Sequence, residues 1–523
     1  KDDCADLGII KVDMLGLGMM AALQDCLRML HPAAPAGSPE LLDLAQFPPD
    51  DPKVYAMLQA ADTIGLFQVE SRAQMSTLPR MRPRQFYDLV VEVGLIRPGP
   101  VAGKMVHPYL ERRAGRQEVT YPHPSLEPIL KRTLGVPLFQ EQLLKMAMVA
   151  AGFSGGEAEQ LRKAFGFKRP EAKMSAVEEK LRAGMARKGI AGAAADTIVG
   201  FVTSFALYGF PESHAASFAL LVYASAYLKA HHPAEFYAAL LNNQPMGFYS
   251  PATLVQDARR RRVAVLPITV AESDWDCTVA AQRPPAIRLG LRYVSGLRAQ
   301  AGQQVAAERR RAAFSSLDDL RRRTGLSRSE ARLLGELGAL GAGADRTPER
   351  RDALWQVERA WRPAGALYEE LGSPDDPASP LPPMSVSERM LADYRNSGLT
   401  LGPHPFALRR DDLRRRGVRT AAEIRGMPSG RRVKVAGIVL ARQRPGTAKG
   451  IVFMSLEDES GIANIIVPSR TFEAQRLVCV SEPALWIEGV LQNREGVVHV
   501  QAERILPLPG EPAVALVASY DFH

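Results

Sequence analysis

The sequence is poor in cysteine, and it contains no hydrophobic run long enough to cross a bilayer. Four cysteines stand among 523 residues, at positions 4, 26, 277 and 479, and no two of them form a C-x-x-C pair. This spacing argues against a disulfide framework and a zinc site, and it is typical of the reducing cytoplasm. The longest apolar candidate, Ala215 to Leu228, is rich in Ala and Ser and shorter than the ~20 residues that a membrane span needs. We therefore expect a buried helix there, a cytoplasmic protein and no membrane partner.

The start of the chain carries no secretory signal. Its first residues, KDDCADL, include no initiator Met and no cationic leader followed by an apolar block, so we expect the natural N-terminus to lie upstream. The histidines lack H-x-H or H-x-x-x-H spacing, which makes a metal-dependent hydrolase a poor hypothesis. With 46% hydrophobic and 24% charged residues, the composition is that of a globular protein, and the length predicts three or four domains.

Positive charge exceeds negative charge, and the excess is concentrated in short runs. The formal net charge is +9 and the pI is about 9.4. Clustered cations are typical of surfaces that bind polyanions such as nucleic acid. Solvated helix faces, or the arginine-rich composition that accompanies high-GC genomes, are the alternatives. The runs are Arg259–Arg262, Arg309–Arg311, Arg321–Arg323 and Arg414–Arg416.

Changes of hydrophobic period predict an α+β, multidomain protein. Helical spacing dominates from about Thr63 to Asn243. From Arg431 to Leu506 the period changes to two, with turn signals between about five strands, which favours a small β-barrel of the OB kind. The loose composition from Gly343 to Ser387, including GSPDDPASPLPPMS, predicts a flexible linker. The predicted domains are residues 1–60, 61–250, 251–345, 346–430 (linker and small helical segment), 431–507 (barrel) and 508–523 (tail).

The stretch LGIIKVDMLGLGMM, residues 7 to 20, places two charges in a predicted strand. Lys11 and Asp13 are two residues apart, so on a strand both side chains point to the same face. A carboxylate there can ligate Mg²⁺ while the neighbouring amine meets a triphosphate, as two-metal nucleotidyl transfer requires. A salt bridge at the end of the strand is the alternative.

Two arginine-bearing motifs fit phosphate binding. In VGLIRPGP (93 to 100) the fixed φ of Pro98 and the permissive Gly99 form a rigid turn that can hold Arg97 in one direction. LRKAFGFKR (161 to 169) contains Arg162, Lys163, Lys168 and Arg169, and if the segment is helical Arg162 and Arg169 share a face and give a cationic stripe. Arg grips phosphate with a planar fork, which supports both assignments. A charged turn and a solvated amphipathic helix are the alternatives.

The segment YGFPESHAASFALL (208 to 221) places Ser213 and His214 at the start of an apolar helix. Pro211 and Glu212 are good helix-start residues whatever the function. A Ser beside a His in sequence makes no catalytic triad, because no spatial geometry follows from adjacency.

The segment LGLRYVSGL (289 to 297) has the spacing of a helix-hairpin-helix turn. Backbone N–H groups at the N-terminus of the second helix can bind a DNA phosphate, so Gly290 and Gly296 are candidate contacts. Lone matches are common by chance, but the cationic segments ERRRAAF and LRRRTG follow here. The candidate DNA-binding cations are Arg309, Arg310, Arg311, Arg321 and Arg322.

Several segments together resemble one family, and the resemblance covers most of the chain. IIKVDMLGL, GLFQVESRAQM, GLIRPGP, LFQEQLLKMA, LRKAFGFKR and YGFPESHAASFALLVYASAYLKAHHPAEFYAALLN occur in the order seen in the catalytic core of bacterial C-family DNA polymerases, the DnaE-like group of the DNA polymerase III alpha subunit. YGFPESH, GLRYVSGL, RQRPGTAKGIVFMSLEDESGIANIIV and the closing SYDFH resemble its error-prone, ImuC-like branch.

The resemblance implies names for the domains and roles for the candidate residues. Residues 1–60 would be the end of a palm, 61–250 the fingers, 251–345 a helix-hairpin-helix region and 431–507 an OB-like barrel. Asp13 would be the catalytic ligand of Mg²⁺. The residues placed near the incoming nucleotide are Lys11, Arg97, Arg162, Lys163, Ser213 and His214.

The resemblance also implies what this sequence lacks. Two further palm aspartates and a PHP domain belong to upstream segments of the family, so we expect the C-terminal half of a polymerase, inactive alone. The expected activity is that of an error-prone DNA-directed DNA polymerase, which adds dNTPs to a primer 3′-hydroxyl in damage-induced translesion synthesis. Primer–template DNA and dNTPs are the expected partners; a sliding clamp and translesion accessory proteins are further candidates. A non-catalytic DNA-binding adaptor is the alternative.

Two expectations concern DNA directly. The hairpin and the basic runs should hold duplex DNA through phosphates without reading sequence, so affinity should fall steeply with salt. The barrel should meet single-stranded template, with Phe453, Phe472 and Trp486 as candidate stacking residues, or it should dock a protein.

Overall fold

The computed structural model describes most of the chain. The described residues are 7–8, 15–35, 38, 44–96, 106–164, 171–205, 210–247, 249–341, 349–361, 379–445, 448, 450–508 and 520–522. Contacts divide the chain into two compact units. We call Asp43–Ala230 the helical unit, and Lys1–Leu42 together with His231–His523 the mixed unit.

Helices make up the regular structure of the helical unit throughout its described residues. They are α4 (Pro52–Gln59), α5 (Arg72–Met81), α6 (Phe86–Leu95), α8 (Val106–Arg113), α9 (Glu127–Leu130), α10 (Gln140–Ala151), α11 (Gly155–Ala164), α12 (Glu171–Arg187), α13 (Gly192–Phe205) and α14 (Glu212–His231), with the 3-10 turns η1 (Leu44–Gln46), η2 (Pro124–Leu126) and η3 (Lys131–Thr133).

The α14 helix is the core of this unit. Twelve of its twenty residues are buried, which confirms the buried helix expected at residues 215 to 228. Near its C-terminus the fully buried Lys229 ammonium pairs with Asp62 Oδ1 at 3.0 Å and donates to the Ile64 carbonyl at 2.8 Å. A buried ammonium needs such partners, so this contact fixes the loop before α5 against α14.

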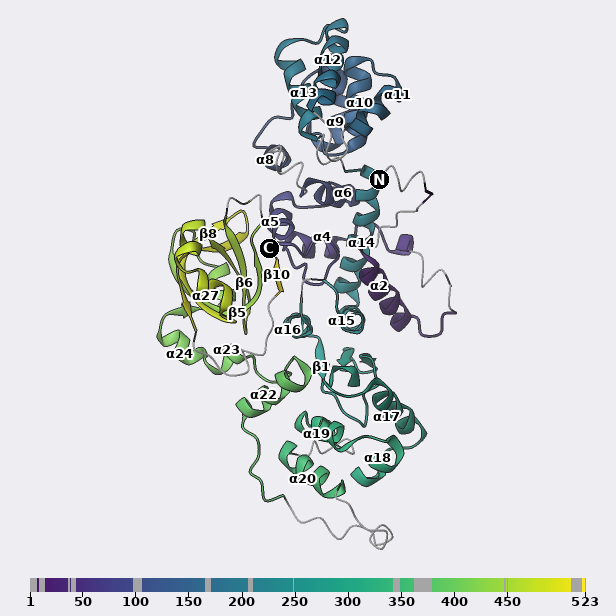
Figure 1. The fold of residues 1–523 in the computed structure, drawn as a ribbon, viewed down its shortest axis with the longest axis vertical. Coiled ribbons are helices and arrows are strands. Elements are labelled where there is room, and N and C mark those ends of the chain that lie inside the picture. Colours follow the sequence, from purple (N-terminus) through teal and green to yellow (C-terminus); the bar gives the residue numbers. More distant parts are fainter. Residues whose placement is uncertain are drawn as a thin grey trace. The chain divides into compact units, whose positions relative to one another are not determined.

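A second bundle in the same unit is formed by α10 to α13 (Figure 1). Helices α10 and α12 approach closely, because a Cβ atom on Gly184 would lie 2.2 Å from the Ala151 carbonyl oxygen. At the start of α10, the buried Gln142 carboxamide accepts from the Leu138 and Phe139 N–H groups and donates to Thr133 Oγ1. The LFQEQ motif therefore ties α10 to the preceding turn.

The mixed unit contains helices, a small sheet and a barrel. Its helices are α2 (Leu17–Leu30), α15 (Pro233–Asn242), α16 (Pro251–Arg260), α17 (Ala299–Arg311), α18 (Leu317–Thr324), α19 (Arg328–Glu336), α20 (Arg350–Ala360), α22 (Val386–Ser397), α23 (Pro405–Leu408), α24 (Arg410–Arg415), α25 (Ala421–Arg425), α26 (Ser469–Ala474) and α27 (Arg476–Ser481), with η4 (Leu291–Tyr293). The small sheet has the order β1 (Ala264–Leu266), β3 (Ala286–Arg288), β2 (Thr278–Ala280).

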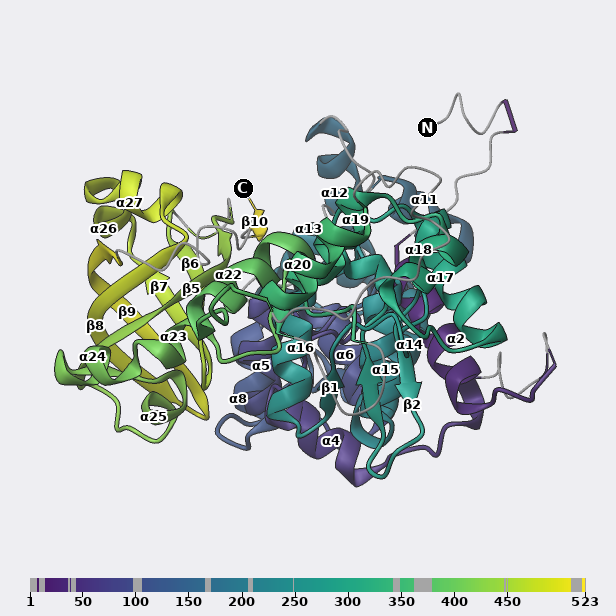
Figure 2. The same cartoon turned by 90° about the horizontal axis from the view of Figure 1, so that it is seen from below.

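Five strands close into a barrel, as the period-two pattern predicts. β5 (Arg432–Gln443) pairs with both β6 (Val452–Asp458) and β8 (Ala484–Arg494), and the circuit β5-β6-β7-β9-β8 returns to β5 through β7 (Gly461–Val467) and β9 (Val497–Pro507). The β7–β9 pair is parallel, and the other four pairs are antiparallel. Figure 2 shows α26 and α27 at one end of the barrel and α25 at the other.

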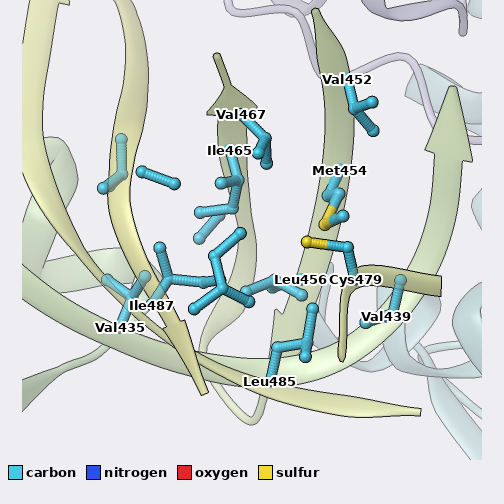
Figure 3. Close-up of a cluster of buried hydrophobic side chains, with 14 of the residues drawn as sticks. Val435, Val439, Val452, Met454, Leu456, Ile465, Val467, Cys479, Leu485 and Ile487 are labelled. Atoms are coloured by element: carbon cyan, nitrogen blue, oxygen red, sulfur yellow. The ribbon is translucent and has the colours of Figure 1, made fainter. Parts of the chain in front are cut away.

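Apolar side chains from alternate positions of these strands fill the barrel. Val435, Leu456, Ile465 and Ile487 are among them, together with Cys479 of α27 (Figure 3). The buried thiol is one of three free cysteines in the described residues, in agreement with the absence of a disulfide framework. The fold is thus α+β, with a helical region, helical hairpins and an OB barrel.

One prediction of local structure is wrong in part. The flexible linker expected from Gly343 to Ser387 contains the helix α20, which packs against α19. Ala353 and Val357, four residues apart, are both buried, because they form the apolar stripe of this helix. The stripe is short, and the proline-rich composition of the residues after it led to the prediction of a linker for the whole segment.

Candidate nucleic-acid interface

Two consecutive hairpins lie between residues 289 and 336. The first consists of η4, the turn at Gly296 and helix α17. Gly296 has φ of +90°, a backbone conformation that favours glycine, and its exposed turn leads into α17. Arg298 at the N-cap of α17 makes no side-chain cap, so the first N–H groups of this helix are not closed by their own cap residue.

The second hairpin consists of α18, the turn at Gly325 and helix α19. Gly325 has φ of +60° and ends α18. Ser327 caps α19 and forms a capping box with Glu330, whose carboxylate accepts from the Ser327 N–H at 2.9 Å. A carboxylate therefore already occupies the N-terminus of α19, where an anion would otherwise bind. The same carboxylate accepts from the Arg298 N–H at the N-cap of α17 at 3.1 Å, so it lies beside the start of both helices.

The Glu330 carboxylate joins the two hairpins. It accepts from Arg298 Nε at 2.8 Å and Nη2 at 2.9 Å, a bidentate pair, and its own side chain is only 4% exposed. Arg298, assisted by the Ser327 and Arg298 N–H groups and the Ser327 hydroxyl, lowers the pKa of Glu330 to about 2. The capping-box spacing S-x-x-E is visible in the sequence, but the contact of Glu330 with Arg298 of the other hairpin could not be predicted from it.

Gly290 has a structural role in this region. It is buried, and its N–H donates to the Cys277 sulfur at 3.4 Å. A Cβ atom at this position would lie 2.4 Å from the Trp275 carbonyl oxygen, so only glycine fits here. The N–H is directed into the protein, and the predicted contact of Gly290 with a DNA phosphate gains no support from this geometry.

The candidate cations differ in how their charge is used. Arg309 is mostly buried and donates to the Ser273 carbonyl and to Asp274 Oδ1. These contacts connect α17 to the loop before β2. Arg310 shares Asp274 at 2.9 Å but is 65% exposed. Arg311 is 77% exposed and pairs only with Glu308 of its own helix, and Arg321 is partly exposed beside Asp318. Arg322 is exposed.

Arg323, which follows these cations, is used inside the fold. Its guanidinium donates to the Glu308 and Ala312 carbonyls at 2.5 and 2.8 Å and to Asp319 at 3.1 Å. The carbonyls belong to the last turn of α17, where a cation also complements the helix dipole. Arg323 thus connects α17 to α18.

The cationic run at 259–262 contacts the barrel. Arg260 of α16 pairs with the buried Glu457 of β6 at 2.6 Å, and Arg259 donates to the Gly402 carbonyl at 3.1 Å. On the other side of the β6–β7 turn, Arg410 of α24 contacts both Asp458 and Glu459. Burial raises the pKa of Glu457 to about 7, with Arg260 acting in the opposite direction.

The outer face of β6 and β7 carries partly exposed apolar side chains. Phe453 and Ile466 are directly opposite each other in the register, and both are half-buried. Phe472 is only 5% exposed and belongs to the barrel core, so its ring is not free to stack on a base. Trp486 packs against a different cluster, which includes Phe406 and Leu413. Phe453 is therefore the best placed of the three predicted stacking residues.

The nucleotide candidates are only partly described. Asp13, Lys11 and Arg97 lie outside the described residues. Arg162 and Lys163 are on α11, and their side chains also lie outside the described part.

The start of α14 is described in full. Ser213 is exposed, whereas the His214 ring lies 5.1 Å from the Phe210 ring and 4.2 Å from the Phe218 ring. The two side chains thus leave the helix in different directions. The Glu212 N–H donates to Glu141 of α10 at 2.9 Å, so the structure brings the LFQEQ and YGFPES motifs together.

No group of three or more His, Cys, Asp or Glu side chains in the described part of the chain could hold a metal ion. Among the same residues, no helix is both long and apolar enough to span a bilayer.

Comparison with protein families matches three regions of the chain. Residues 19–189 match the bacterial DNA polymerase III alpha subunit finger domain, residues 262–353 a helix-hairpin-helix motif, and residues 433–508 an OB-fold nucleic acid binding domain. The second match contains both hairpins, and the third coincides with the barrel.

Curated relatives extend the similarity to the whole chain. A protein named error-prone DNA polymerase from Anaeromyxobacter sp. (strain K) is 48% identical over 537 residues, which cover 100% of this chain and 47% of that protein. Proteins of the same name from Pseudomonas fluorescens (strain Pf0-1) and Methylococcus capsulatus (strain Bath) are 46% and 45% identical, covering 100% and 97% of this chain and 50% and 49% of their own lengths. The chain spans about half the length of the curated relatives it matches.

Proposed function

We propose that this chain is the finger, helix-hairpin-helix and OB-barrel part of an error-prone, DNA-directed DNA polymerase of the ImuC-like branch. One observation carries the proposal: a helical finger region, paired hairpins and an OB barrel follow one another in a chain that is about half identical over its length to error-prone DNA polymerases. The relatives' half-length coverage supports the prediction that the active enzyme is longer and that this part alone does not extend a primer.

Within the enzyme, the hairpins and the barrel would hold the primer–template. The exposed side chains of Arg310, Arg311 and Arg322 can meet phosphates, which carry most of the affinity of DNA-binding proteins. Such contacts do not read base sequence. The outer face of the barrel around Phe453 suits a single strand, because a partly exposed aromatic ring can stack on any base.

The nucleotide site is proposed from the sequence motifs. A primer 3′-hydroxyl would attack the α-phosphorus of a dNTP, with Lys11, Arg97, Arg162 and Lys163 balancing the charge of the triphosphate. Asp13 would hold Mg²⁺, which when bound lowers the pKa of the primer hydroxyl and steadies the leaving pyrophosphate. Ser213 and His214 would lie beside the same site. DNA-damage-induced translesion synthesis, with a sliding clamp and accessory proteins as partners, is the biological role that the branch suggests.

Two measurements test this function. The 523-residue chain should bind duplex DNA of unrelated sequences about equally, and its affinity should fall at least about tenfold between 50 and 200 mM salt. In a polymerase that carries the upstream residues, Asp13→Asn should abolish primer extension and leave DNA binding unchanged, whereas Asp411→Asn, at an exposed site, should leave both unchanged.

The results separate the two functions considered. Salt-independent binding would contradict the DNA-binding proposal. Full extension by Asp13→Asn would remove the assignment of this residue. Binding without any extension, even with the upstream residues present, would favour the non-catalytic adaptor.

A further inference from the structure

A pocket of about 460 Å³ in the helical unit has no role in the function proposed above. It lies at the N-terminal turns of α6 and α14, beside η3, and its lining includes Gln85, Phe86, Tyr87, Arg132 and Glu212. The volume is in the range of small-ligand sites and is large enough for one nucleobase.

One wall of this pocket is a planar stack. The Arg132 guanidinium carbon lies 3.6 Å from the centroid of the Tyr87 ring, and the Tyr87 hydroxyl donates to Glu212 Oε1 at 2.8 Å. The Arg132 side chain is nevertheless 66% exposed, so the face of its guanidinium away from Tyr87 is open. A guanidinium held flat on an aromatic ring is a stacking platform for another planar group. Phe86, which is 36% exposed, adds a second apolar ring to the lining.

The charges of the pocket favour a base over a phosphate. Two carboxylates, Asp50 and Glu212, face a single guanidinium, that of Arg132. The Asp50 contacts with the Phe86 N–H and the Tyr55 hydroxyl both use Oδ1, and the Glu212 contacts with Tyr87 and Arg132 both use Oε1. Carboxylate oxygens accept hydrogen bonds from the amino and imino groups of a base, and they repel phosphate.

The pocket lies on a different face of α14 from Ser213 and His214. Glu212 and Ala216, one turn apart on α14, line it. At 100° per residue, Ser213 points about 100° away from Glu212, and His214 about 200° away, into its aromatic cluster. A ligand in this pocket therefore meets a different face of α14.

We propose that this pocket holds an unpaired, amino-bearing nucleobase of single-stranded DNA. The base stacks on the open face of Arg132, and its N–H edge donates to Glu212 and Asp50. This inference rests on the proposed function and adds to it a site for one base of the single-stranded template. The same chemistry would fit the base of a free nucleotide, but the two carboxylates disfavour a triphosphate.

The probe is a primer–template whose 5′ overhang is oligo-dT with one 2-aminopurine, an amino-bearing fluorescent base, moved through successive positions. Stacking quenches this fluorophore. With the wild-type chain, we expect quenching of several-fold at one overhang position. Arg132→Ala and Arg132→Lys should both abolish the quenching at that position, because Lys keeps the charge but not the planar face. Lys131→Ala is the matched control, since it removes an exposed cation from the adjacent residue, which does not line the pocket.

Each result decides the question. Equal quenching by the wild type and Arg132→Lys, or quenching without preference for position, would overturn the inference while leaving the DNA-binding function in place. Equal quenching of free 2-aminopurine deoxynucleoside triphosphate would overturn the assignment to the template strand. Absence of duplex binding by the wild-type chain would instead refute the proposed function. Thermal unfolding of each variant within about 1 °C of the wild type shows that the fold is retained.

Discussion

Glu92→Gln should make the stability of the protein less dependent on pH, because Glu92 is a buried carboxyl group without compensation in the described structure. It lies on α6 and is 0% exposed. Neither of its oxygens has a hydrogen-bond partner among the described residues. Asp88, one turn earlier on the same helix, has instead the Arg113 guanidinium at 2.6 Å. Burial raises the pKa of Glu92 well above its ordinary value.

The sign of the effect follows from this direction. An unfolded chain releases the Glu92 proton near the ordinary pKa of about 4.3, whereas the folded protein keeps it to a higher pH. Between the two values the folded state binds one proton more, so the free energy of unfolding falls by up to about 1.4 kcal/mol for each pH unit of increase. Gln cannot titrate, and the variant should lack this slope. For a cooperative unit the size of Asp43–Ala230, 1.4 kcal/mol corresponds to about 3 to 5 °C.

The assay is thermal unfolding of the full chain and of two variants between pH 5 and 7. The stability of Glu92→Gln relative to the wild type should increase as the pH rises. The stability of the exposed control Glu118→Gln should change with pH in the same way as that of the wild type. Glu92→Leu, which also removes the buried polar atoms, should be more stable than the wild type by about 1 to 3 kcal/mol at pH 5, and this difference should grow with pH because Leu cannot titrate either. Parallel curves for the wild type and Glu92→Gln would refute the reasoning, since they would mean that Glu92 is ionised and paired in the folded protein.

Other variants test the barrel and the hairpins. Glu330→Gln should destabilise the hairpins by about 2 kcal/mol at pH 7. This difference should shrink as the pH falls below the ordinary pKa of a glutamate, about 4.3, toward the folded pKa of about 2, because the wild type then loses the same charge. Urea unfolding at pH 7 and pH 3 measures the difference. Gly489→Ala should destabilise the barrel by about 1 to 3 kcal/mol, because its Cβ would lie 2.1 Å from a carbonyl oxygen of β9, whereas Gly200→Ala, with no atom within 4 Å, should not; melting midpoints that agree for the two would contradict this. Arg322→Ala should reduce the salt slope of duplex binding by about 1 without loss of stability, whereas Arg323→Ala should lower the stability. DNA titrations at several salt concentrations and thermal unfolding measure the two effects. Loss of stability in Arg322→Ala but not in Arg323→Ala would contradict the assignment of exposed and structural cations.

The barrel and the core helix were predictable because each depends on the order of apolar residues along the chain. Alternation over β5 to β9 places one face of every strand inside, and a helix without charges from Ala215 to Leu228 can only be buried. The helix α20 was not predicted, because its short apolar stripe is followed by a long proline-rich stretch. The roles of Asp13 and Arg97 stay predictions, since both lie outside the described residues.

Residue type did not reveal how each arginine is used, because that depends on which carboxylate or carbonyl lies nearby in space. Arg260, Arg309 and Arg323 all belong to cationic runs, and each directs its guanidinium into the fold. Accessible charges remain on Arg310, Arg311 and Arg322 of the hairpin helices α17 and α18, and on the Arg414–Arg416 run at the end of α24. A net charge of +9 therefore overstates the cationic surface on the α16 side. The Glu330 carboxylate accepts from the Ser327 N–H at the start of α19 and from the Arg298 N–H at the N-cap of α17, so a carboxylate lies beside the start of each helix. The exposed guanidinium groups, rather than the helix starts, are therefore the groups of the hairpins that are available to an anion.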